Sequence, residues 1–116
     1  MSGAYKKDED KARFHLVPPE SIKGVADVLT FGAKKYGERN WEKGLDSSRI
    51  FSAAQRHLWA WWSGEENDHE SGLSHLHHAA ANVMMLQTVG SGFKRLVDNR
   101  PEADPQMSFD FNQPQK

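Results

Sequence analysis

Apolar side chains recur every three or four residues in three stretches of the chain, which is the periodicity of an amphipathic α-helix. The first helix is predicted over residues 20–36, after two prolines and before Gly37. The second is predicted from a polar cap cluster at 46–48 to about residue 62, and the third over about 71–89. No stretch alternates apolar and polar residues as a half-buried strand does, so the pattern predicts an all-α fold.

Each predicted helix carries one apolar face. The residues expected on these faces are Ile22, Val25, Ala26, Leu29 and Ala33 in the first helix, Ile50, Phe51, Ala54, Leu58 and Trp61 in the second, and Leu73, Leu76, Ala80, Val83 and Leu86 or Gln87 in the third. Three helices of this length make only a small core, and Met84 and Met85 extend the apolar surface of the third helix beyond its face. We therefore expect a helical bundle that is completed by oligomerisation with a second chain.

The polarity of the chain divides it into three parts. Residues 1–20 are predicted to form an extended polar segment, residues 21–100 the helical domain, and residues 101–116 a flexible tail rich in Pro, Gln and Asp. The 116 residues carry a net charge of −1 and no cysteine, with no apolar run long enough for a membrane span and no signal-peptide core. These features predict a soluble, cytoplasmic protein without a global attraction to nucleic acid.

Carboxylates and histidines gather where the second helix meets the third. The carboxylates Glu65, Glu66, Asp68 and Glu70 are followed by the histidines His75, His77 and His78. At 100° per residue, His75, His78 and Asn82 lie within about 60° of one another beside the apolar face, where helical bundles place metal ligands. His57 of the second helix can face the same seam, whereas His77 points elsewhere and is expected at the surface.

Two interpretations of this cluster stay open. The carboxylates can form a solvated helix junction with structural histidines beside it, or the two groups can converge on a metal ion. A cluster rich in oxygen ligands, with only one or two imidazoles, suits Mg²⁺ or Mn²⁺ better than zinc.

Two further stretches, KDEDKARF and AKKYGERNW, interleave cations with an aromatic side chain. The cations that could hold phosphates there are Lys11, Arg13, Lys34, Lys35 and Arg39. Tyr36 or Trp41 could cover a base, and Arg49 and Arg56, one heptad apart in the second helix, could reach the same cleft. The alternative is that lysines near helix ends only complement the helix dipole and that the tryptophans of the second helix belong to a core or an interface.

Two blocks of the sequence resemble, in order and spacing, the dATP/dGTP diphosphohydrolase N-terminal domain family. They are KDEDKARFHLVPPESIKGVADVLTFGAKKYGERNW and AAQRHLWAWWSGEENDHESGLSHLHHAAANVMML. Members of this family include the MazZ-type, MazG-like nucleotide pyrophosphohydrolases of phages. The resemblance covers about residues 6–90. It implies an all-α enzyme that converts (d)GTP, or dATP, to the monophosphate and pyrophosphate with Mg²⁺ or Mn²⁺. It also implies a homodimer or homotetramer, in the host bacterial cytoplasm if the chain is phage-encoded, that supplies dGMP for 2-aminoadenine nucleotide synthesis.

The chain departs from the pattern of the MazG-like enzymes, which carry ExxE on one helix and ExxD on the next. Asn82 falls at the Asp position, and the region 53–57 has no carboxylate, so the resemblance implies a rebuilt metal shell. The implied metal ligands are Glu65, Glu66, Asp68, Glu70, His78 and Asn82. The implied catalytic residues are Glu65, Asp68 and His75. The implied substrate-binding residues are Lys11, Arg13, Lys35, Asn40, Trp41, Arg56 and His57.

Two other functions compete with this one. An HD-type phosphohydrolase also mixes histidine and carboxylate on helices, but it needs a contiguous His-Asp pair, and only the reverse order occurs, at Asp68–His69. The non-enzymatic alternative is a small phage nucleic-acid-binding or replication accessory protein, whose affinity for DNA would fall steeply with rising salt.

The tail contains the segment QMSFDF, Gln106–Phe111, which places Met107, Phe109 and Phe111 at alternate positions in a polar stretch. It resembles the Gln-Leu-Ser-Leu-x-Leu peptides that dock on bacterial sliding clamps, so a clamp is a candidate partner. The alternative is that these side chains pack against the bundle or against a neighbouring subunit.

Overall fold

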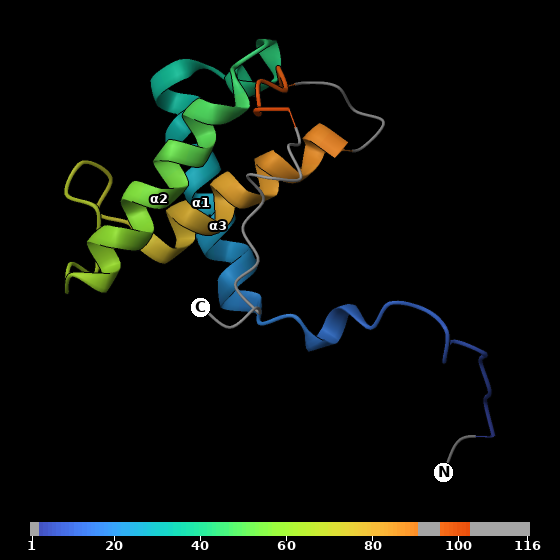
Figure 1. The fold of residues 1–116 in the computed structure, drawn as a ribbon. Coiled ribbons are helices and arrows are strands. Elements are labelled where there is room, and N and C mark those ends of the chain that lie inside the picture. Colours follow the sequence, from blue (N-terminus) through green and yellow to red (C-terminus); the bar gives the residue numbers. More distant parts are fainter. Residues whose placement is uncertain (1–2, 91–95, 103–116) are drawn as a thin grey trace, which may run out of the picture.

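The computed structural model describes residues 3–90 and 96–102, which are dominated by three α-helices (Figure 1). These helices are α1 (Pro19–Tyr36), α2 (Ser47–Trp62) and α3 (His75–Gln87), and the short 3-10 helices are η1 (Phe14–Leu16), η2 (Asn40–Lys43) and η3 (Thr88–Gly90). α3 packs against both α2 and α1 and is therefore the central helix. The β-type pairing within the described ranges is limited to two isolated bridges, so the predicted all-α fold is confirmed.

The starts of α1 and α3 differ from the sequence prediction. α1 begins at Pro19, because proline already has the φ of a first helical turn and no partner is needed for a backbone N–H there. α3 begins at His75 rather than near residue 71, because Ser74 is its N-cap. The Ser74 hydroxyl accepts hydrogen bonds from the backbone N–H groups of Leu76 and His77 at 3.1 and 3.5 Å. Residues 64–74 therefore form a loop.

The start of α2 is capped by a residue that lies far away in the sequence. Asn99 Oδ1 accepts hydrogen bonds from the backbone N–H of Ser48 and from the hydroxyl of Ser47, each at 2.9 Å. Asp46, at the N-cap position, makes no side-chain capping bond. The segment that carries Asn99 is held by Val97, whose carbonyl accepts from the Ser47 N–H at 2.9 Å. The predicted cap cluster at 46–48 is thus completed from outside α2.

The hydrophobic core is smaller than predicted and lies on both sides of α3, against α1 and against α2. Its buried apolar residues are Val25, Val28, Ile50, Ala54, Ala79, Ala81 and Leu96. Of these, Val25, Val28 and Ala81 form a cluster against which Leu73 and Ala80 pack. Several residues predicted on the buried faces are exposed instead, namely Ile22, Ala26 and Leu29 in α1, Phe51, Leu58 and Trp61 in α2, and Leu76 and Val83 in α3. No large side chain among the described residues is fully buried.

Two features explain why the packing faces differ from the predicted ones. α1 lies close to α3 at Gly24, where an added Cβ would be 2.2–2.4 Å from ring atoms of His77. His77 is therefore half-buried against α1, and its predicted surface position is wrong. The buried side of α3 also carries His75, His78 and Asn82, so a polar row occupies part of the space that an apolar stripe was expected to fill.

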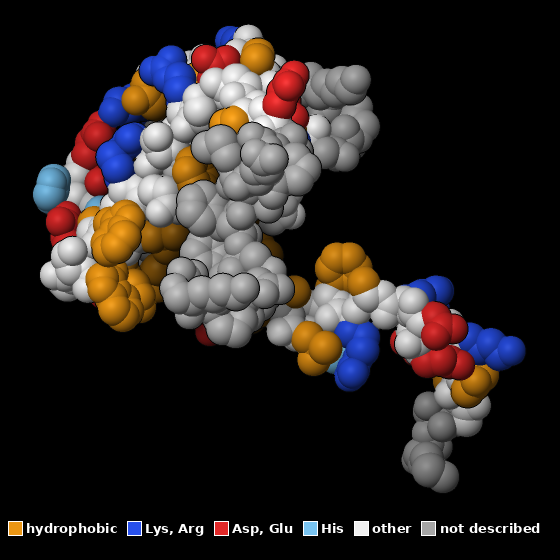
Figure 2. Space-filling model, in the orientation of Figure 1, with side chains coloured by type: hydrophobic (Ala, Val, Ile, Leu, Met, Phe, Trp, Pro, Cys, Tyr) orange, Lys and Arg blue, Asp and Glu red, His pale blue; other side chains and the backbone are white. Residues whose placement is uncertain are grey.

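Residues 3–18 form an arm that extends away from the bundle (Figure 1). Its aromatic side chains are open to solvent, with Tyr5 79% and Phe14 81% exposed, and Figure 2 shows hydrophobic and charged side chains along it. No helix in the described part of the chain is both long and apolar enough to cross a membrane. The predicted clamp-binding segment, residues 106–111, lies outside the described residues.

Candidate metal centre

The loop between α2 and α3 folds back on itself and brings a carboxylate to the start of α3. Asn67 and Ser74 pair as an antiparallel bridge, and the Asp68 N–H donates to the Leu73 carbonyl at 2.8 Å. Gly72 has a φ of +74°, a left-handed value that glycine adopts without steric cost. This turn directs the Asp68 side chain towards the first turn of α3.

Side chains from three elements converge in this region. They are His57 of α2, Asp68 of the loop and His75 of α3, and one ligand atom of each lies within 4.8 Å of the others. The Nδ1 atoms of His57 and His75 are 2.8 Å apart. His75 is only 4% exposed, and the other two are half-buried. Asp68 and His75 belong to the predicted catalytic set, whereas His57 was expected to contact substrate. We call these three residues the His–Asp centre.

Ser71 links Asp68 to His78. The Ser71 backbone N–H and hydroxyl donate to Asp68 Oδ2 at 2.9 and 3.1 Å, and the hydroxyl oxygen lies 2.7 Å from His78 Nε2. Because the single hydroxyl hydrogen points to Asp68, the hydroxyl oxygen accepts from the His78 Nε2–H. Burial acts to raise the pKa of Asp68, but the two hydrogen bonds from Ser71 outweigh it and hold the pKa below its usual value. The carboxylate is therefore ionised at neutral pH.

Ser71 was not among the predicted site residues. The sequence contains one local signal for it: Asp68 is followed three residues later by Ser71 and then by Gly72. This pattern is typical of a turn in which the Asp side chain accepts a hydrogen bond from a backbone N–H. The link from Ser71 to His78 depends on how the loop folds over α3, and the turn pattern does not contain that information.

The imidazoles of His57 and His78 are held in the neutral form. The rings of His57 and His78 stack, with centroids 4.4 Å apart and planes at 9°. Burial lowers the pKa of His57 to about 4, with further lowering from the charges that His78 and His75 would carry. Burial likewise lowers the pKa of His78. Neutral imidazole is the form that offers a lone pair to a metal ion.

Glu65 lies beside the opposite edge of the His75 ring. Its Oε1 atom is 3.2 Å from His75 Nε2 and 3.1 Å from His69 Nδ1. The approach to His75 is not aligned as a hydrogen bond, so the buried Nε2 has no hydrogen-bond partner among the described residues. Buried polar atoms rarely stay unpaired, and a small rotation of the Glu65 carboxylate would pair this one.

The other predicted ligands lie outside the His–Asp centre. Glu66 is exposed, and Glu70 forms an ion pair with Lys35 Nζ that raises the pKa of Lys35. Asn82 is buried and donates from Nδ2 to the His78 carbonyl at 2.9 Å. His78 stands at the edge of the centre, with Nε2 4.0 Å from Asp68 Oδ2. The proposed ligand roles of these residues stay predictions.

A polar pocket, which we call the arginine pocket, lies on the exposed side of α2. It is lined by Ser48, Arg49, Ser52 and Arg56. Arg56 directly precedes His57, and its charge contributes to lowering the pKa of His57. The other residues predicted to bind substrate lie elsewhere: Lys11 and Arg13 are exposed in the arm, and Asn40 and Trp41 are half-buried in η2.

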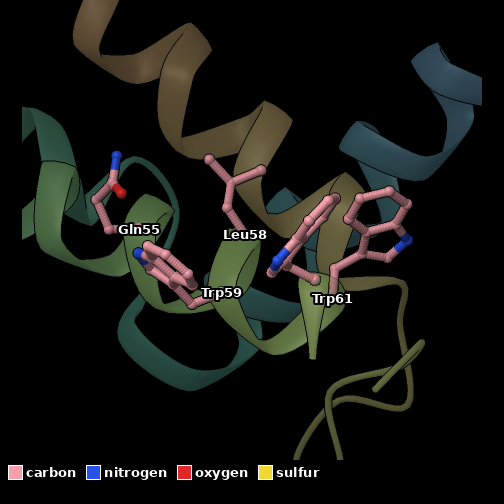
Figure 3. Close-up of a pocket in the computed structure, with 5 residues that line it drawn as sticks. Gln55, Leu58, Trp59 and Trp61 are labelled. Carbon is pink, nitrogen blue, oxygen red and sulfur yellow. The ribbon is translucent and has the colours of Figure 1, made fainter. Parts of the chain in front are cut away.

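A second hollow on α2 is apolar. Gln55, Leu58, Trp59, Trp61 and Trp62 line it, and Figure 3 shows their side chains projecting from the helix. Trp59 is 63% exposed and Trp62 is 74% exposed. Hydrophobic side chains also gather at one end of the bundle in Figure 2. We call these five residues the tryptophan groove.

Comparison with known proteins assigns the chain to a family. Residues 2–100 match the model described as dATP/dGTP diphosphohydrolase, N-terminal. The chain belongs to this family. A dATP/dGTP diphosphohydrolase of Salmonella phage PMBT28 is 36% identical over 99 residues, which make up 85% of this chain and 31% of the phage protein. The chain thus spans about a third of the length of that relative. No solved structure matches the chain.

The part of the chain that matches the dATP/dGTP diphosphohydrolase family contains the whole His–Asp centre and the arginine pocket. The centre and the pocket therefore both belong to the family domain. The family membership predicted from the two sequence blocks is confirmed.

Proposed function

We propose that this chain catalyses the metal-dependent hydrolysis of a purine nucleoside triphosphate between its α and β phosphates. One water molecule is consumed, the bond to the bridging oxygen breaks, and the products are a nucleoside monophosphate and pyrophosphate. The observation that carries the proposal is the convergence of His57, Asp68 and His75, with an arginine pocket on the helix that carries His57, in a member of the dATP/dGTP diphosphohydrolase family.

The donor set of the His–Asp centre fits a divalent cation. Two imidazole nitrogens and one carboxylate oxygen within 4.8 Å of one another can reach a common ion at bond lengths of about 2.0–2.2 Å. The low pKa values of His57 and Asp68 keep both in the form that binds metal. A divalent ion, when bound, would lower the pKa of a coordinated water and neutralise phosphate oxygens.

The surrounding side chains supply the remaining functions in this proposal. Asp68 is held in one orientation by Ser71, so it would bind without reorganisation. Glu65 is half exposed at its carboxylate and would accept a proton from the attacking water. Arg49 and Arg56 line one pocket and would pair with phosphate oxygens, which guanidinium groups bind through two parallel hydrogen bonds.

For the substrate we propose a purine deoxynucleotide. The relative from Salmonella phage PMBT28 is described as a dATP/dGTP diphosphohydrolase, and the half-buried Trp41 and Asn40 would stack on the base and form hydrogen bonds with it. The finer proposal is that dGTP is converted to dGMP for the synthesis of 2-aminoadenine nucleotides. It rests on the family resemblance.

We also propose that the active species is a homodimer or homotetramer. The support is the surface of α2 and α3, where Phe51, Trp59 and Trp62 of α2 and Val83 and Met84 of α3 are each more than 40% exposed. Apolar side chains gathered on adjacent helices are typical of a face that packs against another subunit.

The activity is tested by incubating the chain with dGTP, dATP, GTP and dCTP in the presence of Mg²⁺ or Mn²⁺ and resolving the products by chromatography. The expected result is purine monophosphate and pyrophosphate in equal amounts, with loss of activity in Asp68→Asn. Asp98→Ala is the matched control, because the contacts of the Asp98 side chain among the described residues are with the nearby Arg100 at the surface. Absence of pyrophosphate with every purine substrate would overturn the proposal.

A further inference from the structure

The His–Asp centre offers more nitrogen than a typical magnesium site. The Nδ1 atoms of His57 and His75 are 2.8 Å apart and lie within reach of the Asp68 carboxylate. Mg²⁺ takes oxygen ligands and keeps several of its waters. Imidazole nitrogen suits first-row transition metals such as zinc, cobalt and nickel. With two nitrogens and one oxygen, the donor set differs from the oxygen-rich cluster that the sequence suggested.

The surroundings of His75 match those of a metal-bound histidine. Its Nδ1 atom faces His57, while the opposite ring nitrogen, Nε2, is buried without a hydrogen bond and lies 3.2 Å from Glu65 Oε1. A histidine that binds metal through one nitrogen usually directs its other N–H to a carboxylate, which fixes the tautomer. Glu65 therefore stands where such an outer carboxylate is expected.

The other two donors are held by one common scaffold. Ser71 fixes Asp68 through two hydrogen bonds and accepts from His78, and the His78 ring stacks on His57. A preorganised set of donors lowers the cost of binding a metal.

We propose that His57, His75 and Asp68 bind one first-row transition-metal dication, with Glu65 and Ser71 as positioning residues, and that Mg²⁺ binds there much more weakly. Three protein ligands leave positions open for water and substrate, as in catalytic metal sites. The inference deepens the proposed function and rests on it for the role of the ion, but the binding itself is measured without any substrate.

The test is a titration of the metal-free full chain, prepared with a chelator, against Co²⁺, Zn²⁺ and Mg²⁺. Co²⁺ binding is followed by its visible absorption and by calorimetry. We expect one Co²⁺ per chain at micromolar concentration, displacement by Zn²⁺, and no displacement by a hundredfold excess of Mg²⁺. Mg²⁺ binding as tight as that of Co²⁺ would overturn the proposal.

Variants assign the ligands. Because His75 is buried, its replacement could disturb folding, so His57→Gln and Asp68→Asn are the primary variants, with circular dichroism as the check on helicity. Each should weaken Co²⁺ binding at least tenfold. His15→Gln, at an exposed position of the arm, should leave it unchanged. Unchanged Co²⁺ affinity in both primary variants would overturn the assignment.

The binding and the hydrolysis can fail separately. If Co²⁺ binds as expected and no nucleotide is cleaved, the metal site stands and the proposed function falls. If purine triphosphates are cleaved with Mg²⁺ while Co²⁺ binds no better than Mg²⁺, the proposed function stands and the transition-metal site falls.

Discussion

At the scale of single residues, Gly24 determines how closely α1 approaches α3. A Cβ at this position would lie 2.2 Å from His77 Nδ1 and 2.4 Å from His77 Cγ, which is next to the backbone and has little room to move. Gly24→Ala should therefore destabilise the fold by about 1–3 kcal/mol, measured by urea unfolding. Gly32→Ala is the matched control, because no atom lies within 4 Å of its Cβ, and it should stabilise α1 by about 0.5–1 kcal/mol.

A double variant makes this prediction specific. If the clash with His77 is the cause, Gly24→Ala combined with His77→Ala should be less destabilised than the sum of the two single variants. A gain in stability in Gly24→Ala, as large as that in Gly32→Ala, would show that α1 and α3 do not meet at this point.

His57 should make the stability of the metal-free protein depend on pH. Its folded-state pKa is about 4, below the ordinary 6.5, because burial disfavours the charged ring. Between pH 6.5 and 4 the unfolded chain binds a proton that the folded chain excludes, so stability is complete above pH 6.5 and falls as the pH decreases through this window. Burial also lowers the pKa of His78, so this residue contributes to the pH dependence in the same direction.

The measurement is the urea midpoint at pH 7.5 and pH 5.0 in the presence of a chelator. The wild-type midpoint should drop at pH 5.0, and the drop should be smaller in His57→Gln, which cannot take up a proton. An identical drop in the two proteins would mean that His57 is not held neutral by the fold.

Sequence reasoning identified most members of the site but not their arrangement. Asp68, His75 and His78 were found because they follow one another around the loop and one side of a helix. The role of His57 and the contribution of Ser71 depend on the rotation of α2 against α3 and on the path of the loop, which are properties of tertiary packing. The sequence predicts that these side chains can approach one another, and only the fold decides which atoms meet.

At the scale of secondary-structure elements, the start of α2 depends on Asn99. This side chain accepts from the Ser48 N–H and the Ser47 hydroxyl and donates to the Ser48 hydroxyl at 2.7 Å, while Asp46 provides no cap. Asn99→Ala should destabilise the protein by about 0.5–2 kcal/mol, the usual cost of losing a cap, measured by thermal unfolding. Asp98→Ala should change stability little, because its partner Arg100 is exposed. Equal stabilities of the two variants would contradict the capping role.

The helix boundaries were predicted well where a local signal existed. Gly37 ends α1, and Trp62 is the last residue of α2, as expected. The start of α3 was predicted several residues too early. Several polar residues before Ser74 are equally suited to be the N-cap, and the sequence alone does not distinguish them from Ser74. The capping of α2 by Asn99 could not be predicted, since nothing near residue 46 indicates a partner about fifty positions away.

At the scale of the whole molecule, the amphipathic faces of α2 and α3 are only partly buried by the residues that the structure describes. The sequence predicted an incomplete core, and the described residues indeed contain no fully buried large side chain. The residues expected to fill the core, such as Phe51 and Leu58, are exposed instead. A periodicity analysis finds an apolar face correctly but does not tell whether the partner of that face is in the same chain or in another one.

The tryptophan groove provides the test of association. Trp59 and Trp62 are mostly exposed, and burying large aromatic side chains at an interface contributes strongly to binding. We expect at least a dimer in sedimentation at micromolar concentration, and the double variant Trp59→Glu with Trp62→Glu should shift it to monomer, because a buried unpaired carboxylate is costly. Thr30→Glu adds a negative charge at an exposed position of α1 and should leave the assembly unchanged. A wild-type chain that sediments as a monomer while hydrolysing nucleotide would show that the exposed faces of α2 serve another purpose.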